Sequence, residues 1–172
     1  GGMRYLRGIA GWIQFQAATK VRLVALVVEN RFKFEDIVHT ILGKFSKTSG
    51  KFTGDGLHSP RAIKNAMDNN IIEIWDKTKT IKYAKFEDIP INANGVREIS
   101  IVRGNGSEKI YKSIFPDAWE DSDIVEGIIE ASYVLGENNT FSKMVTKKGI
   151  TILINGYFRN GDISIGFPFI IN

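Results

Sequence analysis

The chain contains no cysteine, which excludes a disulfide framework and any metal site built on thiolates. It has only 4 prolines, and its 17 glycines follow no fixed period, so collagen-like and low-complexity structures are excluded too. Imidazole is also scarce, because His39 and His58 are the only histidines. What remains is a chain of 172 residues, 43% hydrophobic and 24% charged, which is typical of one globular domain that folds without cross-links.

A long uncharged apolar run is missing as well. Residues 4–29 are rich in apolar side chains, but basic residues such as Arg7, Lys20 and Arg22 interrupt them. Because a membrane-spanning helix needs about 20 consecutive apolar residues, we predict a helical extension over residues 1–33 and no stable membrane insertion. The 23 basic residues exceed the 19 acidic ones, and the net charge of +4 mildly favours a polyanionic partner.

Further along the chain, hydrophobic periodicity separates helices from strands. Apolar residues at helical spacing, flanked by capping and stop residues, predict helices at 34–42 before Gly43, at 60–67 after Ser59, and at 122–136 between Ser122 and Gly136. Alternating or apolar runs predict strands at 72–75, 99–102, 109–115, 150–158 and 163–169. The last two strands are joined through Asn160-Gly161, a pair typical of a tight hairpin turn. This order predicts an α+β fold with N-terminal helices, then antiparallel β-sheets with a packed helix.

The two histidines flank a loop rich in Gly, Ser and Lys. His39 lies on the first of these helices and His58 just before the second, 19 residues later, so the loop can fold back and bring both rings into one pocket. Two imidazoles in different protonation states can cleave RNA through its own 2′-hydroxyl, one removing that proton and the other protonating the leaving 5′-oxygen. In the alternative interpretations, both are ordinary packed or helix-flanking residues, or they form a metal site with Asp55.

Such a reaction also needs a fixed positive charge near the non-bridging phosphate oxygens. Lys109 and Lys112 share one predicted strand but point to opposite faces, so only one can normally reach a given cleft. Ser113 next to them offers a hydroxyl.

A basic cluster with interleaved aromatic residues surrounds both histidines. It comprises Lys44, Phe45, Lys47, Lys51, Phe52, Arg61 and Lys64. The cluster would attract a phosphate backbone and its rings could stack on bases, unless it is a solvated loop whose Phe side chains enter the core. The sequence has neither a Walker-type Gly-Lys-Ser/Thr segment nor a Gly-x-Ser-x-Gly elbow, which argues against nucleotide binding and serine-hydrolase chemistry.

Four short motifs occur in a fixed order: His39-Thr40-Ile41-Leu42-Gly43, then Asp55-Gly56-Leu57-His58, then the strand from Lys109 to Phe115-Pro116 followed by Trp119, and finally Gly166-Phe167-Pro168. Together they resemble the EndoU family of endoribonucleases, especially its bacterial toxin branch. The resemblance covers roughly residues 34–170. It implies an EndoU or RNase A-like domain over residues 34–172.

The resemblance also implies roles for particular residues. His39 would be the general acid, His58 the general base and Lys109 the cation, with Lys112 as the alternative. Substrate-binding residues would be Ser113, Lys112, Ser164, Phe167 and Lys51. The implied product is a 2′,3′-cyclic phosphate, with no metal ligand or cofactor required and manganese as a possible activator. Ile165 stands where the family has a hydroxyl residue, so we expect a weaker or different uridine preference.

The toxin branch implies a wider biology. The chain would be a secreted or contact-delivered endoribonuclease toxin that acts on RNA, with tRNA as a plausible target, in the cytoplasm of a target cell. A cognate immunity protein with an acidic face would be its partner. Two alternatives stay open: a catalytically inactive RNA-binding or protein-interaction domain of the same fold, and a metal-dependent phosphodiesterase. Two essential imidazoles would give a bell-shaped pH profile with limbs on either side of about 6.5.

Overall fold

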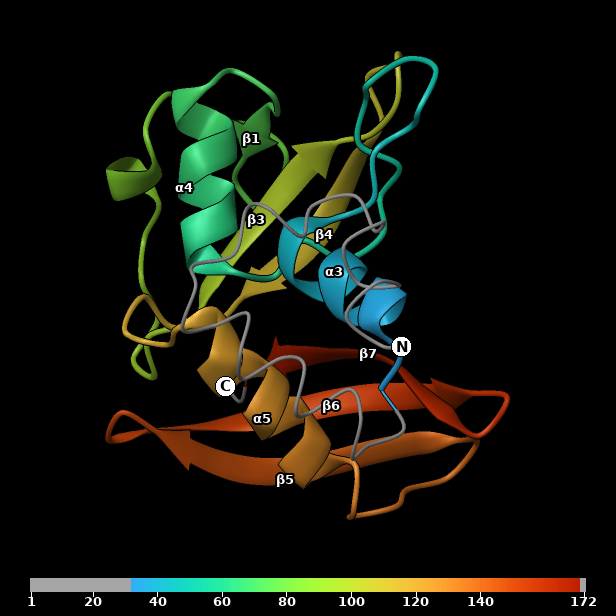
Figure 1. Cartoon of the computed structure of the whole chain (residues 1–172). Helices are drawn as coiled ribbons and strands as arrows, with labels where there is room; N and C mark the ends of the chain where they lie inside the picture. The colour runs from blue at the N-terminus through green and yellow to red at the C-terminus, as the bar shows by residue number, and fades with distance from the viewer. Residues whose placement is uncertain (1–31, 171–172) are drawn as a thin grey trace.

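The computed structural model describes residues 32–170, and in this part of the chain the fold is α+β, as predicted (Figure 1). The strands form two separate antiparallel sheets. The first has the order β2 (Lys82–Tyr83), β1 (Ile74–Trp75), β3 (Arg97–Val102), β4 (Lys109–Ile114), and the second has the order β5 (Thr140–Lys147), β6 (Ile150–Arg159), β7 (Asp162–Phe169). Most of the predicted N-terminal extension lies outside the described residues. Its last two residues contact β7, because Phe32 pairs with Ile163 and is buried, and Lys33 Nζ lies 3.5 Å from the Asp162 carboxylate.

The first two described helices begin and end at the predicted signals. Helix α3 (Phe34–Leu42) stops at Gly43, whose φ of +78° is readily adopted only by glycine. Helix α4 (Pro60–Asp68) has proline in its first turn, and the Ser59 hydroxyl accepts a hydrogen bond from the backbone N–H of Ala62 at 3.3 Å.

Helix α5 (Asp121–Ala131) corrects the prediction for its segment. It is capped by Glu120 rather than Ser122, because the side chains of Glu120 and Asp123 each accept a backbone N–H of the other residue. It ends at Ala131, before the predicted stop at Gly136. The chain turns away there because it must reach the start of the next strand, where Leu135 forms a bridge with Phe141.

The four-stranded sheet comprises β1 (Ile74–Trp75), β2 (Lys82–Tyr83), β3 (Arg97–Val102) and β4 (Lys109–Ile114), with the short 3-10 helix η2 (Phe86–Asp88) between β2 and β3. We call the face that carries buried Ile74, Ile99 and Ile101 the inner face, and the opposite face, with Trp75 and Tyr111, the outer face. Helices α3 and α4 lie over this sheet in Figure 1. The predicted strand 72–75 is shorter than expected, and the two-residue strand β2 was not predicted.

The second sheet comprises β5 (Thr140–Lys147), β6 (Ile150–Arg159) and β7 (Asp162–Phe169). The predicted hairpin between β6 and β7 is confirmed, and both turn residues have positive φ, +53° at Asn160 and +82° at Gly161. The pairing shifts register between Tyr157 and Phe158, which leaves Ser164 as the extra residue of a β-bulge. Strand β5 was not predicted from the sequence.

The functional region lies where the two sheets meet. Helix α5 packs against the β5-β6-β7 sheet, while β7 also contacts α3 and β4 (Figure 1). The elements that carry the two histidines, the strand lysines and the closing hairpin therefore converge. None of the helices between residues 32 and 170 is long and apolar enough to cross a membrane.

Candidate active site

Direct backbone hydrogen bonds join the segments that carry the two histidines. The N–H of Leu57 donates to the carbonyl oxygen of His39 at 3.0 Å, and the N–H of His58 donates to that of Thr40 at 2.9 Å. Gly56 makes this approach possible: its φ is +69°, and a Cβ atom there would lie 1.7 Å from the His39 oxygen. The prediction that the loop folds back on α3 is therefore confirmed for the backbone.

The imidazole of His58 is buried and held in one orientation. His58 is only 4% exposed, and its Nδ1 lies 2.7 Å from the carbonyl oxygen of Ser113 on β4. Because a carbonyl oxygen can only accept, Nδ1 carries the proton, and Nε2 of the neutral ring keeps a lone pair. The ring of Phe167 on β7 stacks against the imidazole with centroids 6.0 Å apart.

Burial and a neighbouring cation keep His58 neutral. Loss of solvation is the main cause, and with the charge of Lys112 it lowers the pKa of His58 to about 3, although the hydrogen bond to Ser113 opposes the shift. At neutral pH this ring is therefore a proton acceptor. This lowered pKa differs from the ordinary value on which the expected bell-shaped pH profile rests, and that profile stays a prediction.

Lys112, rather than Lys109, is the strand lysine that faces His58. In the β3-β4 register Lys112 pairs with buried Ile99 on the inner face, whereas Lys109 pairs with Val102 on the outer face. Lys109 Nζ lies 4.3 Å from the ring centroid of Trp75, a cation–π contact away from the histidines. The residue predicted as the cation is thus on the wrong side of the sheet, and its alternative lies on the right one.

The ammonium of Lys112 is itself partly removed from water. Burial lowers its pKa, while the carboxylate of Asp55 in the loop before His58 raises it. Its Nζ lies 5.9 Å from the ring centroid of Phe52. Lys112 is therefore a positioned cation between the loop and His58.

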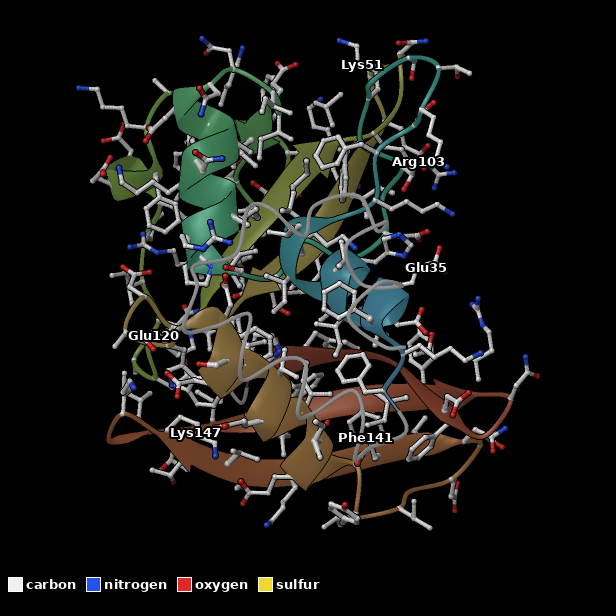
Figure 2. All side chains as sticks on the ribbon, in the orientation of Figure 1. Glu35, Lys51, Arg103, Glu120, Phe141 and Lys147 are labelled. Atoms are coloured by element: carbon white, nitrogen blue, oxygen red, sulfur yellow. The ribbon has the colours of Figure 1, made fainter. Side chains whose placement is uncertain are left out.

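The remaining predicted substrate residues are distributed differently. Ser113 is buried and contributes its carbonyl oxygen to His58, while strand alternation places its side chain on the outer face, and its role as a substrate-binding hydroxyl stays a prediction. Phe167 joins the site through its stack on His58. Ser164 is half-buried at the bulge of β7. Lys51 is exposed at the tip of the loop, away from His58, where it lines a separate cavity (Figure 2).

Two basic residues of the cluster are paired with carboxylates, so fewer positive charges remain than the sequence predicts. Arg61 forms an ion pair with Asp121 at 2.7 Å, and Lys64 forms one with Glu87 at 2.8 Å. The loop aromatics turn inward, since Phe52 is buried and its ring lies 5.6 Å from that of half-buried Phe45. Exposed positive charge near the loop thus comes from Lys44, Lys47 and Lys51 and from Arg103, whose side chain lies beside Gly54.

A buried polar network that the sequence did not reveal fixes the segment of His58. The hydroxyl of Ser59 donates to Asp121 at 2.7 Å, and Phe115 donates its backbone N–H to the carbonyl oxygen of His58 at 3.0 Å. The ring of Phe115 in turn stacks on Trp119 with centroids 5.6 Å apart. The Phe-Pro-x-x-Trp motif therefore anchors the end of β4 beside the imidazole. In the sequence, the spacing of this motif was the only signal that it anchors the strand.

The described residues contain no group of three or more His, Asp or Glu side chains arranged to hold a metal ion. A site formed by His39, His58 and Asp55 would also place a metal cation near the Lys112 charge, which already lowers the pKa of His58. The geometry favours acid–base chemistry at His58 and electrostatic stabilisation by Lys112.

No protein-family model matches the sequence, and no curated protein matches it. Among solved structures, XendoU, described as a splicing-independent snoRNA-processing endoribonuclease, is similar over 99% of this chain and 68% of its own. The sequence identity is 13% and the TM-score is 0.46. Because a superposition at this level does not establish a common fold, the function proposed below rests on the geometry of the site and on the sequence motifs.

Proposed function

We infer that the chain is a metal-independent endoribonuclease that cleaves RNA by transesterification and leaves a 2′,3′-cyclic phosphate. One observation carries the inference: a buried, neutral His58 is oriented through Nδ1 by the Ser113 carbonyl, beside the Lys112 ammonium, on a segment bonded to that of His39. A proton acceptor, a cation and a second imidazole are the groups this reaction needs.

Each group has one role in the proposed reaction. Nε2 of His58 removes the proton of the 2′-hydroxyl, and the 2′-oxygen forms a bond to phosphorus while the bond from phosphorus to the 5′-oxygen breaks. His39 protonates that leaving oxygen, so the products are a cyclic phosphate and a free 5′-hydroxyl. Lys112 stabilises the negative charge that builds up on the non-bridging oxygens. The same anionic charge stabilises the imidazolium as it forms, which offsets the low pKa of His58 in the free protein.

Cleavage of total RNA in EDTA, followed by analysis of the 3′ ends, tests this proposal. The wild-type chain should give cyclic phosphate ends, and His39→Ala and His58→Ala should each lower the rate by about 10²–10⁴-fold while circular dichroism shows an intact fold. Near-normal cleavage by either variant would contradict the acid–base assignment. Activity that disappears in EDTA would indicate a metal-dependent phosphodiesterase, and a folded wild type that cuts no RNA would indicate a binding domain.

The proposal extends to a toxin of the bacterial EndoU branch, secreted or contact-delivered, with tRNA as its target and an immunity protein as its partner. The four ordered motifs and the net charge of +4 support it. Induced expression in bacterial cells should arrest growth and produce tRNA fragments, whereas His58→Ala should do neither. Growth arrest that persists in His58→Ala would contradict a nuclease toxin.

A further inference from the structure

A cavity of about 480 Å³ opens beside the tip of the 43–57 loop, and His58 is not part of its lining. It lies between that loop, the residues that follow α4, and strands β1 and β2, close to the position of Lys51 in Figure 2. Phe52 relates the cavity to the catalytic region, because it lines the cavity and its ring also lies 5.9 Å from Lys112 Nζ. The cavity and Lys112 therefore share Phe52 as a neighbour.

The walls combine an apolar floor with charged groups at the rim. Buried Met67 and Ile74 and half-buried Tyr83 provide flat or apolar surface. Exposed Lys51 and Lys82 provide positive charge. A volume in this range is typical of small-ligand sites, and a planar base attached to a phosphate matches a lining in which aromatic and aliphatic side chains lie beside charged ones.

One carboxylate adds a polar preference. Glu73 also lines the cavity, where its Oε1 lies 3.3 Å from Lys82 Nζ and accepts a hydrogen bond from the indole N–H of Trp75 at 3.2 Å. A fixed carboxylate can accept a hydrogen bond from an exocyclic amino group, which cytosine, adenine and guanine carry and uracil lacks.

We propose that this cavity is a base pocket for the substrate RNA, and that it takes the nucleotide next to the dinucleotide that is cut. This inference rests on the proposed function. The base enters the apolar floor, its phosphates meet Lys51 and Lys82, and Glu73 favours an amino-bearing base over uracil. Splayed bases held in pockets are a common mode of single-stranded RNA recognition.

Two matched pairs of variants test the base pocket. Ala84→Trp fills the cavity from an exposed position on its lining, whereas Ala93→Trp places the same bulk on an exposed loop outside it. Lys82→Ala removes a rim charge, whereas Lys85→Ala removes an exposed charge that is not part of the lining. Affinity is measured with a 2′-O-methyl RNA oligonucleotide, which binds but lacks the attacking hydroxyl.

Ala84→Trp should weaken oligonucleotide binding by roughly fivefold or more, the scale of one lost base contact, and Lys82→Ala should weaken it less. Both should cleave a dinucleotide as wild type does, and both control variants should bind and cleave normally. Ala84→Trp that binds the oligonucleotide as Ala93→Trp does would overturn the base pocket. The base pocket would also be overturned if free AMP or CMP bound at the cavity while Ala84→Trp left the affinity for RNA unchanged. A wild type that binds the oligonucleotide but cuts no RNA would instead contradict the proposed function.

Discussion

The two faces of the β2-β1-β3-β4 sheet carry lysines from the same strand in opposite circumstances. On the inner face, Lys112 is partly desolvated, lies near Asp55 and lowers the pKa of His58. On the outer face, Lys109 lies over Trp75, and the Tyr111 hydroxyl donates to Glu98 at 2.8 Å. Lys112 therefore lies beside an imidazole and Lys109 over an indole, so the face of β4 decides which of its two lysines can serve chemistry at His58.

On the inner face, the charge of Lys112 is kept against the cost of burial. Burial lowers the pKa of both Lys112 and His58, because it disfavours their charged forms. Since the His58 ring stays neutral, it is not repelled by the charge of Lys112. Such paired shifts are common at catalytic sites and uncommon on solvated strand surfaces. The following predictions test whether the two faces differ in this way.

The largest contrast is expected between Lys112→Ala and Lys109→Ala. Lys112→Ala should lower the rate of RNA cleavage by about 10²–10³-fold, because the charge on the non-bridging oxygens loses its fixed cation. Lys109→Ala should leave the rate within about threefold, because Lys109 lies on the outer face and its half-buried cation–π contact with Trp75 contributes only about 1 kcal/mol to stability. Single-turnover rates at saturating enzyme measure both. Equal losses in the two variants would remove the distinction between the faces.

A smaller but clear contrast is expected between two glycines of the loop that seats His58. Gly56→Ala and Gly50→Ala impose similar backbone strain, because φ is +69° and +72°, but only Gly56 has a backbone oxygen in the way. Gly50→Ala should cost about 1–2 kcal/mol of unfolding free energy. Gly56→Ala should cost at least about 3 kcal/mol, since the added Cβ forces the His58 segment away from α3.

Urea unfolding measures the free energies of the two glycine variants, and cleavage assays show whether activity falls with them. Equal stability and activity in Gly56→Ala and Gly50→Ala would mean that the contact between residues 56 and 39 does not hold the two histidines together.

The dependence of stability on pH gives a separate contrast. The folded protein keeps His58 neutral down to a pKa of about 3, while the unfolded chain takes up this proton near the ordinary value of 6.5. The contribution of His58 to stability is therefore complete above about pH 6.5 and is lost progressively as the pH falls toward 3. His58→Gln should remove this component, so the loss of stability on acidification should be shallower in the variant. Parallel curves for the two proteins would contradict a neutral buried ring.

The sequence predicted local structure better than it predicted faces. Gly43, Ser59 and the Asn160-Gly161 turn act through their own backbone conformations, so their signals were sufficient. Lys109 and Lys112 could be assigned to opposite faces by alternation, but which face met His58 depended on long-range packing.

Hydrogen bonds between residues far apart in the sequence could not be predicted from it. The bond from Ser59 to Asp121 joins residues 62 positions apart, and the contact of His58 with the Ser113 carbonyl joins residues 55 apart. Neither leaves a pattern in one chain, because any buried hydroxyl or imidazole can find such a partner once the fold is formed. The bulge at Ser164 is similar, since it depends on how β7 pairs with β6.

The central claim is that Lys112, and not Lys109, is the charge beside His58. The direct measurement is the pKa and tautomer of the His58 ring, followed by nitrogen NMR in the wild type, Lys112→Met and Lys109→Met. We predict a neutral ring protonated at Nδ1 at pH 7 in all three, a raised pKa of His58 in Lys112→Met, and an unchanged one in Lys109→Met. A pKa of His58 that rises in Lys109→Met and not in Lys112→Met would contradict the account.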